Sequence, residues 1–451
     1  MRILDWNTLD RQARRAALAR PQVQVRAEVT RVAAELVDQV RRHGDAALKT
    51  LTQRFDAADI KCLAVDRNEF AEARRALTDE QIAALERAIA NVQRFHELQL
   101  PKSRVVDIET GVRCEELIRP IASVGLYVPG GTAPLPSTVI MLAVPARIAG
   151  CPQRVLCTPP RRDDTVHPAV LAAAQLCGID SVFKVGGAQA IAALAYGTES
   201  IPRVDKIFGP GNSWVTAAKA LVANDPEGAA CDLPAGPSEV LVVADETAQA
   251  ELVAADLLAQ AEHDPLAQAI LVTDSHPLAK RVAREIRTQR QALSRGQILT
   301  QSLSACRAIV VPDLDTALQV ANEFAPEHLV LQVKEPRRYL AHVQNAGAVF
   351  LGPWSAEPLG DYCSGTNHVL PTDGHARNFS GLSVRDFVKT LTVQEVSPAG
   401  LFALGPTAVT LAKLEGLDAH AQAVTRRLVA LKAQARTSAV GRGATTCPGA
   451  V

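Results

Sequence analysis

A glutamate and a histidine stand next to each other at the start of an apolar run in the stretch EFAPEHLVL, residues 323–331. Adjacent residues of a regular strand point to opposite faces, so Glu327 and His328 act together only if the turn before the strand bends the chain. Pro326 favours such a bend, because its ring fixes its own φ and disfavours helical geometry in the residue before it. The pattern therefore indicates either a paired carboxylate and imidazole at the mouth of a buried strand or a polar loop tip.

A second group of residues has the side-chain types that bind a transition metal. Gln260 and His263 in LLAQAEHDPLAQ (257–268) are one helical turn apart, near the end of a helix that Pro265 helps to terminate. The segments LGDYCSGTNH (359–368) and KLEGLDAHA (413–421) add Asp361, Glu415 and His420. Imidazole nitrogens with carboxylate or amide oxygens suit zinc, and also manganese or cobalt. Nothing local connects the three segments, and a solvated helix end is the better explanation of the first one taken alone.

Glycine-rich turns follow three runs that have the character of short strands. They are VPGGTAP (128–134), VGGAQA (185–190) and FGPGNSW (208–214), and each leads into a helical pattern. Ligands of open α/β sheets bind outside the carboxyl ends of the strands, so the three turns together predict a ligand crevice, although each alone is an ordinary tight turn. The chain has neither a phosphate-binding G-x-x-x-x-G-K-[ST] nor a G-x-G-x-x-G after a first strand. A dinucleotide bound here would not use the usual fingerprint.

The elements that must position these residues alternate regularly. Residues 24–100 have the apolar spacing of helices, with an interruption at Gly44 and a capping box from Thr78 to Gln81. Short strand-like runs follow at 123–128, 154–158, 181–185, 205–209, 238–245, 269–274, 307–312, 328–333 and 347–352. Helical runs separate most of them and return after about residue 380. Strand and helix in alternation predict two α/β units in tandem, with parallel sheets covered on both faces.

Composition narrows the class of protein. A chain of 451 residues exceeds a comfortable single core, so two or more domains are expected. Forty-eight basic residues balance 48 acidic ones, which leaves no electrostatic argument for nucleic acid or a membrane as a partner. Nine scattered cysteines without a C-x-x-C pair favour reduced thiols. No stretch has the length of a signal peptide core or a transmembrane span, so the cytoplasm is the expected location.

Six stretches together resemble the histidinol dehydrogenase family, in order and over nearly the whole chain. They are GLYVPGGTAPLPSTVIMLAVPA, FGPGNSWVTAAK, DLPAGPSEVLV, QAEHDP, FAPEHL and GDYCSGTNHVLPTDGHARNFSGLSVRDFVKTLTVQEVS. The resemblance implies a homodimer with exchanged segments, built on two tandem, incomplete Rossmann-like (aldehyde-dehydrogenase-like) parallel-sheet domains with small helical N- and C-terminal extensions. The domains expected are an N-terminal arm (1–24), a first α/β domain with the metal and catalytic residues (25–120 and 237–380), a second, NAD-binding α/β domain (121–236), a C-terminal helical dimerisation extension (381–434) and a disordered tail (435–451).

The activity implied by the resemblance is the NAD-dependent, four-electron oxidation of L-histidinol to L-histidine through L-histidinaldehyde, the last step of histidine biosynthesis. Besides NAD it implies one zinc ion per subunit, with manganese or cobalt as alternatives. By position, the acid–base pair is Glu327 and His328, and the metal ligands are Gln260, His263, Asp361 and His420. The residues expected to contact the substrate are Ser238, Gln260, His263, His328, Asp361, Glu415 and His420. The residues expected to contact NAD are Tyr127, Gln189 and Asn212.

The two oxidation steps suggest roles for the pair. A neutral imidazole suits removal of the hydroxyl proton, so His328 is the expected base. Oxidation of the aldehyde needs its hydrate, and Glu327 is expected to activate that water. Cys363 stands where the family leads us to expect a small residue, and a thiol adduct is the rival route for this second step. Two other functions remain open: a zinc-dependent hydrolase that uses Glu327 and His328 without NAD, and a non-catalytic protein whose two α/β lobes close on a ligand.

Overall fold

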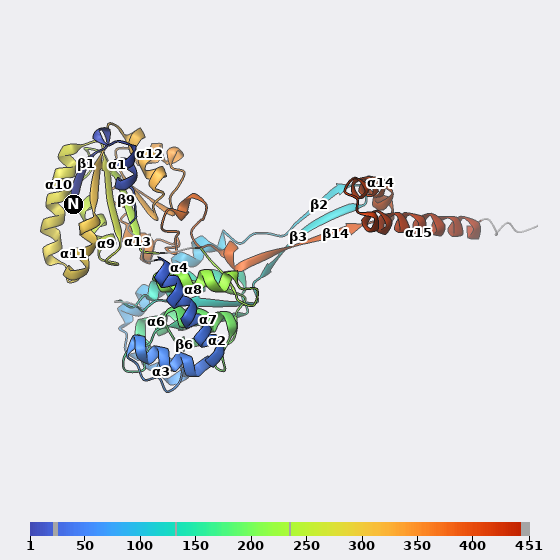
Figure 1. Cartoon of the computed structure of the whole chain (residues 1–451), viewed down its shortest axis with the longest axis horizontal. Coiled ribbons are helices and arrows are strands. Elements are labelled where there is room, and N and C mark those ends of the chain that lie inside the picture. The colour runs from blue at the N-terminus through green and yellow to red at the C-terminus, as the bar shows by residue number, and fades with distance from the viewer. Residues whose placement is uncertain (21–25, 131–132, 234–235, 443–451) are drawn as a thin grey trace, which may run out of the picture. The chain divides into compact units, whose positions relative to one another are not determined.

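The computed structural model describes residues 1–20, 26–130, 133–233 and 236–442 (Figure 1). The chain divides into two compact units. The first unit contains residues 1–100 and 120–387, and the second contains residues 101–119 and 388–451. Within the described residues, every helix is too short or too polar to traverse a lipid bilayer.

A six-stranded parallel sheet forms one half of the first unit. Its strands follow the order β1 (Arg2–Asp5), β11 (Arg307–Val310), β10 (Gln268–Thr273), β9 (Glu239–Ala244), β12 (His328–Gln332) and β13 (Ala348–Leu351). Strand β1 comes from the segment that the sequence predicted to be an N-terminal arm. Its Leu4 pairs with Ile309, and Trp6 and Leu18 enter the core, so these residues belong to the sheet layer.

Both faces of this sheet are buried, which explains the continuous apolar runs of its strands. Along β9, Val240 and Val242 enter one core cluster and Leu241 and Val243 enter the other, as the alternation of side chains in a strand requires. Helices α9 (Ala250–Ala261), α10 (His276–Gln289) and α11 (Gly296–Ala305) supply the first cluster. The second cluster receives α12 (Leu314–Phe324) and the end of α1 (Arg11–Ala17).

A five-stranded parallel sheet forms the other half of the first unit. Its order is β6 (Val182–Lys184), β5 (Gln153–Thr158), β4 (Ser123–Tyr127), β7 (Lys206–Phe208) and β8 (Ala230–Cys231). Helices α2 (Arg26–Asp56), α7 (Gly187–Tyr196) and α8 (Ser213–Asn224) pack together on one face. The remaining helices of this half are α3 (Arg67–Arg75), α4 (Asp79–Glu97), α5 (Pro136–Ala149) and α6 (Pro168–Leu176).

The N-terminal helices therefore lie with the five-stranded sheet, whereas the sequence grouped residues 25–120 with the other α/β domain. Leu36, Leu48 and Leu51 of α2 share one core cluster with Phe183 and Ile191. The apolar spacing of α2 predicted that it would bury one face, but spacing carries no information about which sheet receives that face. The predicted details within these helices are confirmed: Gly44 interrupts α2, and Thr78 and Gln81 form the capping box of α4.

The second unit is built from segments that are distant in the sequence. Strands β14 (Val388–Val396), β3 (Val112–Pro120) and β2 (Arg104–Glu109) form a three-stranded sheet. Two helices, α14 (Pro398–Leu414) and α15 (Asp418–Arg442), follow β14 and pack on each other. The predicted C-terminal helical region is present, but it begins with a strand. Helix α15 extends into the predicted tail as far as Arg442, and residues 443–451 lie outside the described residues.

Short helical segments complete the description. They are the 3-10 turns η1 (Trp6–Thr8), η2 (Arg290–Ala292), η3 (Pro336–His342), η4 (His375–Arg377) and η5 (Val384–Phe387), and the single-turn helix α13 (Glu357–Tyr362).

A half-buried acid at the end of α2, with one unpaired oxygen, predicts how stability depends on pH. Burial raises the pKa of Asp56 from 3.8 to about 6, and its Oδ2 has no hydrogen-bond partner. The folded state therefore binds the Asp56 proton more tightly than the unfolded chain does. The stability that this proton contributes is fully present below pH 3.8 and is lost as the pH rises through about 6. Asp56→Asn should be more stable than the wild type at neutral and higher pH, by about 1 kcal/mol once solvent screening is allowed for. Urea unfolding on both sides of this range measures the difference, with exposed Asp59→Asn as the control. A stability gain that is independent of pH would contradict the explanation.

Candidate functional site

Glu327 and His328 lie at the entrance of β12, where the preceding turn brings their side chains together. Helix α12 ends at Phe324, Ala325 has the left-handed φ of 52°, and Pro326 follows. Both side chains are buried, with Oε2 of Glu327 3.6 Å from Nδ1 of His328. The pair is therefore not a polar loop tip, because the bend after α12 offsets the opposite directions that a regular strand would give the two residues.

One residue of the neighbouring strand holds both members of the pair. The backbone N–H of Glu239, the first residue of β9, donates to Oε2 of Glu327 at 2.8 Å. The backbone C=O of the same residue lies 3.1 Å from Nδ1 of His328. Since a carbonyl oxygen only accepts, Nδ1 carries the proton in this arrangement. The Nε2 atom of His328 is then the free acceptor, and it has no hydrogen-bond partner.

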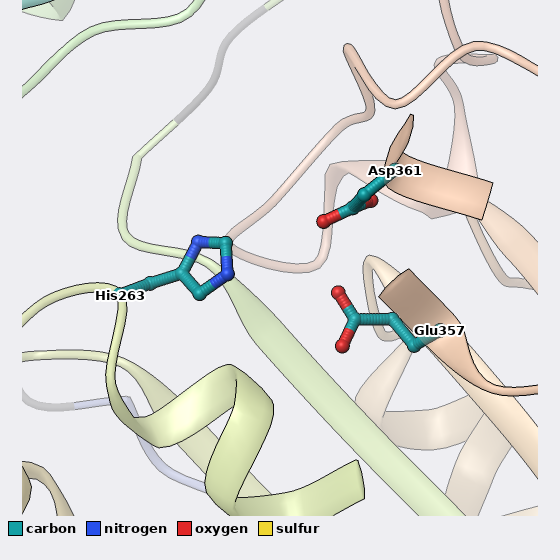
Figure 2. A group of neighbouring side chains, drawn as sticks. All are labelled: His263, Glu357 and Asp361. Atoms are coloured by element: carbon teal, nitrogen blue, oxygen red, sulfur yellow. The ribbon is translucent and has the colours of Figure 1, made fainter. Parts of the chain in front are cut away.

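Three further side chains converge on His328. Oε1 of Gln260 lies 3.1 Å from Nδ1, and Oδ1 of Asp361 lies 3.6 Å from Nε2. Gln260 is in the last turn of α9 and His263 follows that helix, as the sequence predicted. Ligand atoms of His263, Glu357 and Asp361 all lie within 4.8 Å of one another. Figure 2 shows the two carboxylates, both from α13, directed toward the imidazole of His263.

Glu357 is the site residue that the sequence analysis missed. It is fully buried, and neither carboxylate oxygen has a hydrogen-bond partner. Its spacing of four residues from Asp361 places both on one face of α13, and this spacing was visible in AEPLGDY. The signal is weak, because acidic residues at this spacing are common on solvated helices.

Three buried carboxyl groups crowd around one imidazole at this site, and two of them bind their protons more tightly than usual. Burial raises the pKa of Glu327 to about 8 and raises that of Glu357 well above its usual range. Burial alone would lower the pKa of His328, but the carboxylates of Glu327 and Asp361 outweigh it and raise this pKa to about 10. Burial alone would raise the pKa of Asp361, but the neighbouring His328 lowers this pKa below its usual range.

The residues present fit a divalent cation. Both buried oxygens of Glu357 have no hydrogen-bond partner, and imidazole nitrogen with carboxylate oxygen is a donor set that zinc, manganese or cobalt accepts. A cation shared by His263 and Asp361 would offset the carboxylate charge and so favour the neutral form of His328.

The other predicted residues of the first unit lie close to these groups or at a second location. Ser238 directly precedes Glu239, which contacts both members of the pair. His368 is a hydrogen-bonded residue, with Nδ1 2.8 Å from the backbone oxygen of Asp361. Cys363 is half-buried at the end of α13. All eight cysteines among the described residues are free thiols.

Tyr127, Gln189 and Asn212 follow the ends of three different strands of the five-stranded sheet. The hydroxyl of Tyr127, at the end of β4, accepts from the backbone N–H of Gly187 at 3.0 Å, which connects it to the helix that carries Gln189. Asn212 is the N-cap of α8, and its side-chain oxygen accepts from the N–H groups of Trp214 and Val215, each at 3.1 Å. The described residues of the three turns that the sequence singled out therefore lie at the carboxyl edge of one sheet, and residues 131–132 of the first turn lie outside the described residues.

A buried ion pair fixes the last of these turns. The backbone N–H of Gly209 donates to Oδ2 of Asp232 at 2.7 Å, and Nζ of Lys219 donates to the C=O of Gly209 at 3.0 Å. Lys219 and Asp232 also pair with each other. Gly209 has a φ of 124° and lies so near the backbone of Tyr127 that a Cβ would be 2.1 Å from the Tyr127 oxygen. Glycine is therefore required at this position.

Glu415 and His420 lie in the second unit, at the end of α14 and in the first turn of α15, and both are exposed. The structure brings Gln260, His263, His328 and Asp361 together within the first unit.

Comparison with known proteins shows to which family the chain belongs. A family model described as histidinol dehydrogenase matches residues 18–428. A histidinol dehydrogenase of Xanthomonas euvesicatoria pv. vesicatoria is 53% identical over 428 residues, covering 95% of this chain and 99% of the relative. One from Vibrio vulnificus is 50% identical over 434 residues, covering 96% and 100%. The chain belongs to the histidinol dehydrogenase family.

The family fold agrees as well. A crystal structure of histidinol dehydrogenase from Elizabethkingia anophelis has a TM-score of 0.90 and 40% sequence identity, and the match covers 96% of this chain and 99% of that one. The α/β architecture with parallel sheets that the sequence predicted is thereby confirmed.

Proposed function

We propose that this protein oxidises L-histidinol to L-histidine through L-histidinaldehyde, with two molecules of NAD, as the last step of histidine biosynthesis in the cytoplasm. The observation that supports this activity most strongly is the arrangement of His328, with one ring nitrogen fixed by a backbone carbonyl and the other free beside a cluster of candidate metal ligands. Membership of the histidinol dehydrogenase family supports the choice of substrate. Nothing observed favours a hydrolase.

His328 is the base of the first oxidation. Its Nδ1–H is fixed by the carbonyl of Glu239, so the lone pair of Nε2 takes the hydroxyl proton of the alcohol as the carbon gives up hydride. Each oxidation therefore sends two electrons and one proton to NAD as hydride, and one proton to the protein.

Glu327 serves the second oxidation. The aldehyde becomes oxidisable when water adds to its carbonyl carbon and forms the hydrate. A buried carboxylate whose pKa is raised to about 8 suits removal of a proton from that water, and His328 takes the hydroxyl proton of the hydrate in the step that releases the second hydride. Hydride leaves from an oxygen adduct, so Cys363 has no part in this route.

Gln260, His263 and Asp361 would hold a divalent metal ion together with His420, and Glu357 faces the same group. When bound, the ion, zinc by preference, would orient the imidazole and amino nitrogens of the substrate. Ser238 and Glu415 would complete the substrate contacts. Tyr127, Gln189 and Asn212 would contact NAD at the carboxyl edge of the five-stranded sheet.

Glu415 and His420 belong to the second compact unit, and we propose, as the resemblance to the family implies, that they serve the site of a second subunit. The functional form would then be a homodimer in which the C-terminal segment (381–434) of each chain completes the site of its partner.

The number of NADH molecules formed per substrate tests the activity. Incubation of metal-loaded protein with a limiting amount of L-histidinol and excess NAD should produce two equivalents of NADH, measured by absorbance. A hydrolase or a simple binding protein would form no NADH. The Cys363→Ala variant should give the same two equivalents, and loss of the second equivalent alone would replace the water route with a thiol route.

His263→Ala tests the metal site. The variant should lose bound metal and activity together, because only an amide, one carboxylate and one imidazole of the four proposed ligands remain, and such a set holds zinc weakly. Metal content after dialysis, measured by mass spectrometry, is the readout independent of activity. Exposed His276→Ala should retain both. An active His263→Ala enzyme that contains no metal would contradict the assignment.

Mixing two inactive variants tests the shared site. His263→Ala and His420→Ala chains, unfolded and refolded together, should form hybrid dimers in which one of the two sites has all its residues. Random pairing predicts recovery of about a quarter of the wild-type activity. If each subunit used its own His420, every site in the mixture would carry a lesion and no activity would return.

A further inference from the structure

The Glu239 backbone contacts make the position of this one residue decisive for the catalytic pair. Its N–H holds Glu327 and its C=O holds the Nδ1–H of His328, at 2.8 and 3.1 Å. Any movement of β9 at this residue would therefore change the distance between the two side chains and the direction of the free Nε2 of His328.

The Glu239 side chain is itself a buried acid that needs a partner. It is 1% exposed, and burial of an uncompensated carboxylate is strongly unfavourable. The partner is Arg20: its Nε pairs with Oε1 of Glu239, and its terminal nitrogen donates to Oε2 at 2.8 Å. This bidentate contact fixes the orientation of the Glu239 carboxylate and also compensates its charge.

Arg20 also holds the opposite side of the catalytic turn. The same terminal nitrogen donates to the backbone C=O of Phe324 at 2.8 Å, and the guanidinium lies 3.9 Å from the centre of the Phe324 ring. Phe324 is the last residue of α12, and the turn that begins there delivers Glu327 and His328. One guanidinium thus connects the strand that binds the pair to the turn that carries it.

We propose that Arg20, acting through Glu239 and Phe324, is the positioning residue that sets the geometry of the Glu327–His328 pair. It acts through their backbone neighbours rather than through the two side chains themselves, and it comes from the segment that the sequence predicted to be an N-terminal arm. This inference rests on the proposed oxidation of histidinol for its kinetic test, and a spectroscopic test is independent of the substrate.

The kinetic test compares Arg20→Met with Arg14→Met. Arg14 is a matched control from the same segment, since it lies over the Trp6 ring at 4.9 Å and donates to the Trp6 backbone oxygen at 3.1 Å. Arg20→Met should lower kcat on the order of 10- to 100-fold, as expected for a misplaced base, with unchanged KM for histidinol and NAD and unchanged metal content. Arg14→Met should keep the wild-type kcat. Arg20→Lys should have an intermediate kcat, because an ammonium group restores the charge but not the bidentate hydrogen bonding.

The Arg20→Met/Glu239→Gln variant controls for loss of stability, because it removes both charges of the pair and leaves no unpaired buried charge. It should fold and show the same loss of kcat. Wild-type kcat in this folded variant, or a loss of metal and a rise of both KM values in step with the fall in kcat, would overturn the positioning role.

Nitrogen NMR of ¹⁵N-histidine-labelled protein separates this inference from the proposed activity. In the zinc-loaded wild type, where the cation favours the neutral form of His328, this histidine should show a single Nδ1–H tautomer, whereas zinc-loaded Arg20→Met should show a mixture of tautomers. An unchanged tautomer would overturn the inference even if histidinol is the substrate. If the wild type forms no NADH from histidinol, the proposed activity fails, while the tautomer still decides the role of Arg20.

Discussion

The carboxylates of Glu327, Glu357 and Asp361 lie together in the interior beside the imidazole of His328, and a buried negative charge is stable only with compensation. The described residues supply part of it. One backbone N–H reaches Glu327, His328 lies beside Asp361, and both oxygens of Glu357 have no partner. The missing compensation of carboxylate charge gives the site its chemistry. It attracts a cation and raises the proton affinity of the side chains that must accept protons.

The way the six-stranded sheet is built explains why these groups meet. Glu239 and His328 are the first residues of β9 and β12, which are hydrogen-bonded neighbours, so they share one edge of the sheet. Helix α9 runs back from the far edge and delivers Gln260 and His263 at its end. The candidate catalytic group thus lies at the amino edge of its sheet, whereas Tyr127 and Asn212 follow the carboxyl ends of strands in the other sheet. The glycine turns indicated only the second of these locations.

The ion pairs of the first unit show how buried charge can maintain backbone geometry. Lys219 and Asp232 hold both polar groups of Gly209, and Arg20 and Glu239 connect β9 to the end of α12. Such pairs contribute little net stability compared with well-packed apolar residues. They do fix the orientation of the backbone groups that they bind, because each hydrogen bond requires a defined angle. Both pairs lie directly behind a turn that carries candidate functional residues.

The sequence by itself determined the strands that are buried on both faces, because runs such as EVLVVA and HLVLQ leave little alternative, and it determined the chemical types at the site. It missed β2 and β14, whose residues are mostly exposed and give no apolar run, and β1, whose pairing with β11 joins segments about 300 residues apart. Glu357 and Arg20 were also missed. An acid or an arginine looks the same in the sequence whether it is solvated or buried, and only the tertiary structure decides which charges lose water and must therefore find each other.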